Sequence, residues 1–183
     1  MTGLEAALGE IVAFLDCRRI PYMVIGGIAN LVWGVPRATL DIDMTLWVPP
    51  KQEGEVVRAI VGRFDPLPEK PLEFLAETRV LPVRASGFKV DLMFGQLPYE
   101  QQAVRRAREV ELAGRKVRVC SPEDLIVHKI LSERPKDIED VRGLLRRQGG
   151  NLERLYLDPL IEGLAKDLSR PEILEFYRAG LAN

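Results

Sequence analysis

Hydrophobic residues recur along this chain with two periods, and each period predicts a different kind of element. Apolar residues that return every three or four positions predict an amphipathic helix over residues 3–18. Similar patterns predict further helices over 28–33, 53–64, 71–77 and 99–108. Short apolar runs bounded by glycine and proline predict strands over 22–25, 41–48, 79–85, 88–94, 110–113 and 116–120. Ser86-Gly87 is typical of a hairpin turn between the third and fourth of these strands.

From residue 121 to the end, the pattern is helical throughout. Ser121 is followed by Pro122 and two acids, which is typical of a helix start, because serine caps free amides and acids favour the helix dipole. We expect helix breaks at Pro135, Gly149-Gly150, Pro159 and Pro171. The sequence therefore predicts an α+β fold, in which a mixed β-sheet flanked by helices (1–120) is followed by a C-terminal helical lobe (121–183) packed on it.

Composition adds a few constraints. The chain has 183 residues, 46% hydrophobic and 29% charged, which suits a globule with a core. Its net charge of −1 argues against a protein that only coats nucleic acid, although a local basic patch could still bind it. Cys17 and Cys120 form no CxxC pair and are expected to be free thiols. The first 15 residues lack basic side chains, and no stretch approaches the roughly 20 apolar residues of a membrane span, so we expect a cytoplasmic protein with no membrane partner.

Two glycines, Gly26 and Gly27, stand between the predicted strand 22–25 and the predicted helix 28–33. Glycine lets a backbone approach an anion closely, and the free N–H groups at the start of a helix attract phosphate. The succession of strand, glycines and helix therefore indicates a phosphate-binding turn, although a Gly-Gly pair alone is weak evidence for one.

Three acids stand in otherwise apolar predicted strands. Asp41 and Asp43 are two positions apart, so both should face the same side of their strand. Two such carboxylates repel each other unless a cation such as Mg²⁺, which also accepts phosphate oxygens, lies between them. Asp91 interrupts another apolar strand, and if the two strands are neighbours the three carboxylates converge on a site for one or two metal ions. The alternative for Asp41 and Asp43 is a solvent-facing pair on an edge strand.

These motifs together resemble the DNA-polymerase-β-like nucleotidyltransferase superfamily. The resemblance rests on Gly26-Gly27, Arg37-x-Thr39-x-Asp41-Ile42-Asp43 and Val90-Asp91-Leu92. The chain is more closely similar to the AbiE/MenT-type bacterial branch, which includes toxins of toxin–antitoxin systems. A later segment, Glu123 to Ile130 followed by Arg134-x-Lys136-Asp137-x-x-Asp140, is similar to the next motif of that branch. The resemblance covers residues 20–145, and Gly27 stands where the wider superfamily often has serine.

The resemblance implies roles for the matching residues. Residues 1–120 would be the catalytic core. Asp41, Asp43 and Asp91 would be catalytic and bind one or two Mg²⁺ ions, with Asp91 also activating the acceptor hydroxyl. The nucleotide would be bound by Gly26, Gly27, Arg37, Thr39 and Lys129. In this scheme the glycines hold the triphosphate, Arg37 and Thr39 shape the loop before the strand, and Lys129 reaches a phosphate.

Some of these residues have structural alternatives. Lys129 is equally compatible with a surface charge, and Asp137 suits a helix start. Asp137 and Asp140 would either lie near the site or hold the helices of the lobe together. His128, the only histidine, is expected to be structural. A basic region is expected to be a solvated face, with an RNA-binding strip as the alternative, and consists of Arg105, Arg106, Arg108, Arg115, Lys116 and Arg118.

The expected activity is the Mg²⁺-dependent transfer of a nucleoside monophosphate from an NTP, such as ATP, to an acceptor hydroxyl on tRNA or other RNA, a protein or a small molecule. In the toxin branch, RNA or protein is favoured over an antibiotic, and a cognate antitoxin would be the partner. One rival is a non-catalytic nucleotide-binding or regulatory module of the same fold, which usually loses one of the acids. Another is a metal-dependent phosphohydrolase, which the Gly26-Gly27 step disfavours.

Overall fold

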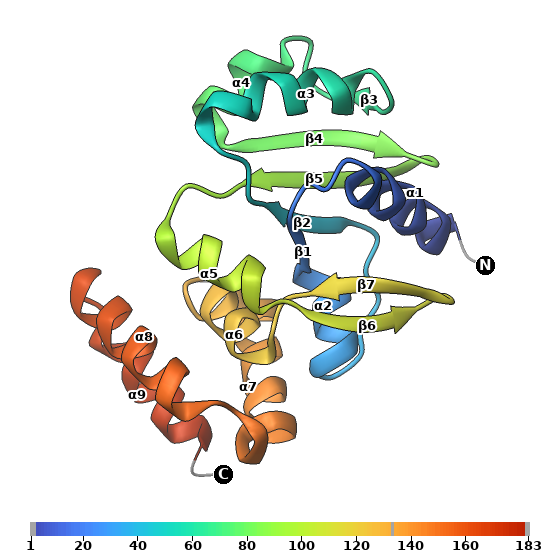
Figure 1. Cartoon of the computed structure of the whole chain (residues 1–183). Helices are drawn as coiled ribbons and strands as arrows, with labels where there is room; N and C mark the ends of the chain where they lie inside the picture. Colours follow the sequence, from blue (N-terminus) through green and yellow to red (C-terminus); the bar gives the residue numbers. More distant parts are fainter. Residues whose placement is uncertain (1–2, 133, 182–183) are drawn as a thin grey trace. The chain divides into compact units, whose positions relative to one another are not determined.

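The computed structural model describes residues 3–132 and 134–181, and the chain divides into two units (Figure 1). The first unit comprises residues 1–28 and 38–120, and the second comprises residues 29–37 and 121–183. The second unit thus includes a short segment, 29–37, that the sequence had assigned to the catalytic core. Each unit has its own buried residues and is described separately below.

A seven-stranded mixed sheet forms the first unit, in the order β3-β4-β5-β2-β1-β7-β6. Strand β2 runs parallel to β5, and β1 runs parallel to β7, while the other neighbours are antiparallel. This sheet confirms the predicted mixed α+β fold. The strands are β1 (Tyr22–Ile25), β2 (Ile42–Leu46), β3 (Asp65–Pro66), β4 (Val80–Ala85), β5 (Phe88–Phe94), β6 (Arg108–Leu112) and β7 (Arg115–Val119).

Helix α1 (Gly3–Cys17) packs against one face of the sheet. Its buried side chains include Ile11 and Leu15, and a Cβ atom at Gly3 would overlap the ring of Phe88 on β5. Because side chains alternate along a strand, the even-numbered residues of β5 from Phe88 to Phe94 face α1, and Asp91 faces the opposite side. The other helices assigned wholly to this unit are η1 (Pro50–Gln52), α3 (Glu53–Val61), α4 (Pro71–Thr78) and α5 (Pro98–Arg106).

Most predicted elements of this unit are confirmed, with differences at their ends. The predicted strand 41–48 is shorter, because pairing of β2 with β5 begins at Ile42, so Asp41 lies just before the strand. The loop predicted after α3 contains the short strand β3. Helix α2 (Gly26–Trp33) begins at the first glycine rather than after the second, directly at the end of β1.

The second unit is helical, with α6 (Pro122–Ile130), α7 (Pro135–Gln148), η2 (Gly149–Asn151), α8 (Arg154–Asp167) and α9 (Pro171–Leu181). Ser121 caps α6 as predicted, because its hydroxyl accepts a hydrogen bond from the amide of Asp124. The predicted break at Pro159 is wrong, since α8 continues through it. Proline leaves the carbonyl of residue 155 without its helical partner, and Leu155 is 97% exposed, so water can reach that carbonyl. Within the described residues, no helix has the length and apolar character needed to cross a membrane.

Candidate active site

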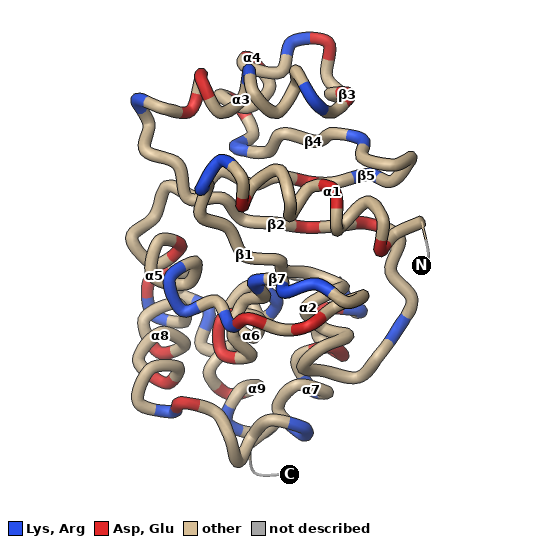
Figure 2. The backbone as a smooth tube through the Cα atoms, turned by 45° about the vertical axis from the view of Figure 1, so that its right-hand side comes forward, with Lys and Arg blue, Asp and Glu red and all other residues tan. Residues whose placement is uncertain are grey.

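Asp43 on β2 and Asp91 on β5 are direct partners in the parallel register of the two strands. Residues in register on neighbouring strands project from the same face, so both carboxylates lie on the face opposite α1. Their strand neighbours Ile42 and Val90 are fully buried on the other face. Figure 2 colours the acidic positions of β2 and β5 red on these neighbouring strands. The sequence predicted that the acids would converge if their two strands were neighbours, and β2 and β5 are adjacent.

Lys89 lies among the three acids. Its ammonium donates a hydrogen bond of 2.7 Å to Oδ2 of Asp91, two positions further along the same face of β5. This bond is the main reason that the pKa of Lys89 is raised, and the charges of Asp41 and Asp43 raise it further. The negative charges of all three acids therefore stabilise the protonated form of Lys89. Asp41 itself is exposed and immediately precedes β2.

The glycine turn leaves room for these residues. Gly26 has a φ of +65°, a left-handed conformation that side chains rarely adopt, and a Cβ atom there would overlap Oδ2 of Asp43. A Cβ atom at Gly27 would overlap the hydroxyl of Thr39, whose Oγ1 donates to the carbonyl of Asp41 at 3.3 Å. The absence of side chains at 26 and 27 thus lets the start of α2 approach both Asp43 and the segment that leads into β2.

The three acids are chemically suited to bind a hard divalent cation, because carboxylate oxygens are the ligands that Mg²⁺ prefers. Asp43 and Asp91 are the two that the register brings together. In the arrangement described for residues 3–132 and 134–181, no group of three or more His, Cys, Asp or Glu side chains is placed to hold a metal ion. Metal binding by Asp41, Asp43 and Asp91 stays a prediction, and Lys89 already donates to one of the two oxygens of Asp91.

In the second unit, Lys129 is almost fully buried and pairs with two carboxylates. Its Nζ lies 2.8 Å from Oδ1 of Asp137 and 2.8 Å from Oδ2 of Asp140. Lys129 is on α6 and both acids are on α7, so these bonds join the two helices. The alternative of a surface charge for Lys129 is wrong, and the proposal that Asp137 and Asp140 hold helices of the lobe is consistent with these bonds. A contact between Lys129 and a nucleotide stays a prediction.

Arg37 and Asn30 extend this cluster within the second unit. The guanidinium of Arg37 donates two hydrogen bonds to Asp140, from Nε to Oδ1 at 3.0 Å and from Nη2 to Oδ2 at 2.8 Å. The amide of Asn30, fully buried on α2, donates to Oδ1 of Asp140 at 3.2 Å and to the carbonyl of Val35 at 2.9 Å. Arg37 thereby fixes the segment that follows α2, which agrees with its predicted role in shaping this loop. Its predicted contact with a nucleotide stays untested.

Both carboxylates of this cluster keep their charge in spite of burial. Burial raises the pKa of Asp137, but hydrogen bonds from Lys129 and Ser132 outweigh it, so the pKa lies below its ordinary value. Burial likewise raises the pKa of Asp140, and bonds from Arg37 and Lys129 bring it below the ordinary range. Arg134 also pairs with Asp137, with its Nε 2.6 Å from Oδ2, so the cluster is an ionised network in which three cations face two acids.

The sequence analysis assigned no role to three residues of these clusters, Lys89, Asn30 and Ser132. A usable signal existed for Lys89, because a residue two positions before Asp91 on a strand must share its face. No comparable signal existed for Asn30, whose partner Asp140 lies 110 positions away in sequence.

The mixed sheet, with paired acids on adjacent strands beside a glycine turn, defines a protein of the nucleotidyltransferase class. Comparison with protein families agrees. The sequence profile of the family described as nucleotidyltransferase of unknown function (DUF6036) matches residues 4–156, and the chain belongs to this family. It is therefore an enzyme of the nucleotidyltransferase class.

Solved structures with the same fold support the architecture. The antibiotic-resistance factor ANT(2″)-Ia has a TM-score of 0.61 at 19% identity, over 92% of this chain and 95% of that one. ANT(2″)-Ia in complex with adenylyl-2″-tobramycin has a TM-score of 0.55 at 18% identity, over 96% and 99% of the two chains. The lincosamide antibiotic adenylyltransferase LnuA, with lincomycin bound, has a TM-score of 0.53 at 14% identity, over 79% and 96%. No curated protein matches this chain in sequence. At these identities, the likeness shows the fold.

Proposed function

We propose that this protein transfers a nucleoside monophosphate from an NTP to an acceptor hydroxyl in a Mg²⁺-dependent reaction. The observation that carries the proposal is the register of Asp43 with Asp91 on adjacent parallel strands, beside a glycine turn that a side chain would block. Two carboxylates on one face, next to the start of a helix, suit a substrate that combines a divalent cation with a polyphosphate.

The glycine turn and the three acids have separate roles in the proposed reaction. The turn at Gly26 and Gly27 begins α2, and the amides of the first helical turn, which have no partner within the helix, would orient a triphosphate. Asp43 and Asp91, together with Asp41, would hold Mg²⁺, which when bound neutralises phosphate charge and favours displacement at phosphorus. Lys89 would compete with the metal ion for Oδ2 of Asp91.

The proposed transfer forms one bond to phosphorus and breaks another. The acceptor oxygen forms a bond to the α-phosphorus, the bond from that phosphorus to the pyrophosphate oxygen breaks, and pyrophosphate leaves. Asp91 would accept the proton of the acceptor hydroxyl, because a carboxylate within hydrogen-bond reach can act as a general base.

Two kinds of similarity bear on the identity of the acceptor. The resemblance of residues 20–145 to the AbiE/MenT-type branch supports a toxin that modifies tRNA, other RNA or a protein, with a cognate antitoxin as its partner. The fold neighbours ANT(2″)-Ia and LnuA, whose names link them to antibiotic resistance or antibiotic adenylylation, support a small-molecule hydroxyl. Both acceptor classes belong to the same reaction and are separated by experiment.

The test uses the full chain with each of the four NTPs, labelled at either the α- or the γ-phosphate, and Mg²⁺. Total RNA, a purified tRNA pool, a cell-protein extract and an aminoglycoside are offered separately as acceptors. The proposal expects α-label on one acceptor together with released pyrophosphate, and loss of both when EDTA is present. Release of inorganic phosphate without transfer would contradict it and favour a phosphohydrolase. Nucleotide binding with no transfer to any of these acceptors would also contradict the proposed reaction.

A further inference from the structure

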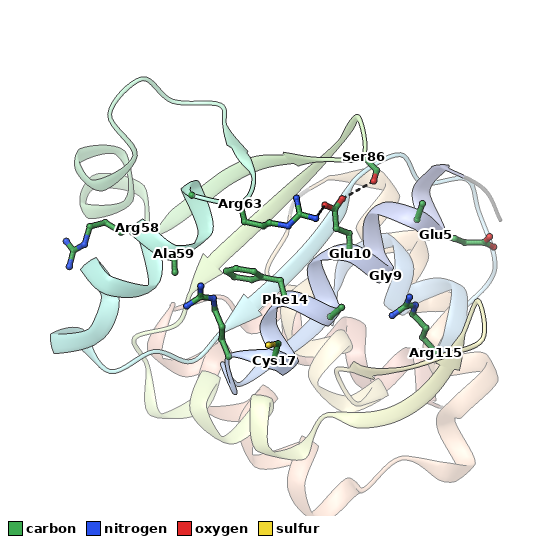
Figure 3. Close-up of a pocket in the computed structure, with 14 residues that line it drawn as sticks. Glu5, Gly9, Glu10, Phe14, Cys17, Arg58, Ala59, Arg63, Ser86 and Arg115 are labelled. Carbon is green, nitrogen blue, oxygen red and sulfur yellow. Dashed lines mark hydrogen bonds and ion pairs between the residues drawn. The ribbon is translucent and has the colours of Figure 1, made fainter.

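A cleft of about 970 Å³ runs along α1 in the first unit (Figure 3). Its floor is α1, and its walls include α3 and Arg115 at the start of β7. Because α1 covers the face of the sheet that carries Phe88, the cleft lies on the side away from Asp43 and Asp91. It is therefore separate from the candidate active site and is not used by the proposed reaction.

Small residues of α1 and α3 line this cleft. Ala6, Gly9 and Ala13 lie three or four positions apart on α1, and Ala59 of α3 and Gly62, directly after α3, lie in the wall. Gly9 is buried, and the side chain of Arg115 lies against it. The opposite face of α1 is the buried one and carries large aliphatic side chains. A surface helix normally presents charged or polar residues on its outer side. Here the small side chains of Ala6 and Ala13 lie among the polar residues of the outer side, so another backbone can approach the helix closely at these two positions.

The charges around this floor are predominantly positive. Glu10, one of the two acids that line the cleft, is already satisfied by Arg63 at 2.6 Å and by the hydroxyl of Ser86 at 2.9 Å (Figure 3). Three exposed arginines have no carboxylate partner among the described residues, namely Arg18, Arg58 and Arg115. Figure 3 shows Arg58 and Arg115 on opposite sides of α1.

We propose that this cleft docks an acidic amphipathic helix of a partner protein. The small floor residues would contact an apolar stripe on the partner helix, and acidic residues beside that stripe would pair with Arg18, Arg58 and Arg115. Helix α1 has 15 residues and is therefore about 22 Å long, enough for roughly four turns of a partner helix. Arginine at the edge of an apolar contact is typical of protein interfaces.

The lining disfavours a nucleic acid as the occupant. Glu5 and Glu10 both line the cleft and would repel a phosphate backbone. Phe14 is the aromatic ring in the lining, and the guanidinium of Arg18 already lies 5.0 Å from its centroid, so it offers little surface for base stacking. The apolar floor matches a side-chain stripe better than a sugar–phosphate chain.

Cys17 provides a direct readout, because it is exposed and lines the cleft, whereas Cys120 is buried. The probe is a synthetic peptide of about 18 residues, long enough to form helix, with a Leu/Ala stripe flanked by Glu. The control peptide keeps the stripe and replaces each Glu with Lys. The rate at which a maleimide labels Cys17 is measured on the full chain with each peptide, and peptide affinity is measured by fluorescence anisotropy.

The proposal expects the acidic peptide to slow labelling of Cys17 and the lysine peptide to have no effect. Reversing two cleft charges, Arg58→Glu with Arg115→Glu, should weaken binding of the acidic peptide at least about tenfold. Arg84→Glu is the matched control, because Arg84 is exposed on β4 in register with Lys89, on the opposite face of the sheet. Circular dichroism checks that each variant is folded.

Four results would overturn the proposal. The acidic peptide could leave Cys17 labelling unchanged, or the lysine peptide could protect it equally well. A single-stranded RNA oligonucleotide could protect Cys17 better than the acidic peptide, which would make the occupant a nucleic acid. Labelling could also slow with protein concentration alone, with a matching dimer in sedimentation, which would make the occupant a second copy of the chain.

Discussion

The ammonium of Lys89 donates to Oδ2 of Asp91 at 2.7 Å, on the strand that carries both residues. Asp91 is in register with Asp43, and the charges of Asp41, Asp43 and Asp91 all raise the pKa of this lysine. A metal ion bound by these acids would compete with the ammonium for Oδ2 of Asp91. Lys89 is therefore a counter-ion of the proposed metal ligands.

Replacing Lys89 should strengthen metal binding. Lys89→Met removes a positive charge from the acids, so Mn²⁺ used as a probe should bind several-fold more tightly. Mn²⁺ titration followed by electron paramagnetic resonance measures this in the absence of nucleotide. Lys116→Met is the control, because Lys116 is an exposed strand lysine paired with Glu109. Weaker Mn²⁺ binding to Lys89→Met would mean that the lysine orients the acids rather than competing for them.

A side chain at Gly26 should destabilise the first unit. Gly26→Ala forces a left-handed φ of +65° on alanine and pushes its Cβ into Asp43. Gly87→Ala carries the same kind of backbone strain, at φ +84°, in open space. We expect Gly26→Ala to lower the free energy of unfolding by about 1–3 kcal/mol more than Gly87→Ala, in urea denaturation. Equal losses would show that Asp43 moves aside at no cost.

Removing the buried cation of the second unit should be costly. Lys129→Met leaves Asp137 and Asp140 buried with one fewer cation, so the free energy of unfolding should fall by about 3 kcal/mol or more. Lys166→Met, at an exposed position of α8, should change it by less than about 0.5 kcal/mol. Urea denaturation followed by circular dichroism compares the two variants. A small loss for Lys129→Met would mean that Arg37 and Arg134 suffice to balance the acids.

The same cluster should make stability sensitive to acid. The pKa values of Asp137 and Asp140 are lower in the folded protein than in the unfolded chain, since bonds from cations outweigh the effect of burial. Their contribution is present above the unfolded pKa of about 4 and is lost as the pH falls through the folded pKa values. Asp140→Asn should therefore flatten the fall in unfolding free energy below about pH 4. An unchanged acid slope in that variant would contradict the assignment.

The sequence predicted local features well and distant ones poorly. The acids of β2 and β5 could be identified because each interrupts an apolar run, and Ser121 because capping is local. The register of Asp43 with Asp91 could not be read from the sequence, since it depends on a strand pairing across two helices and a hairpin. Lys129 looked equally suited to the surface, because its partners Asp137 and Asp140 lie on the next helix and Asp137 also suits a helix start.

The most direct test of the central claim replaces one acid of the in-register pair. Label transfer from an α-labelled NTP is compared for the wild type, Asp91→Asn and Asp65→Asn, on the acceptor that the wild type modifies. Asp65 is an exposed acid of the edge strand β3 and serves as the control for loss of charge. Circular dichroism checks that Asp91→Asn is folded. We predict that this variant loses at least about a hundredfold in transfer rate while Asp65→Asn stays active. Full transfer activity in folded Asp91→Asn would contradict it.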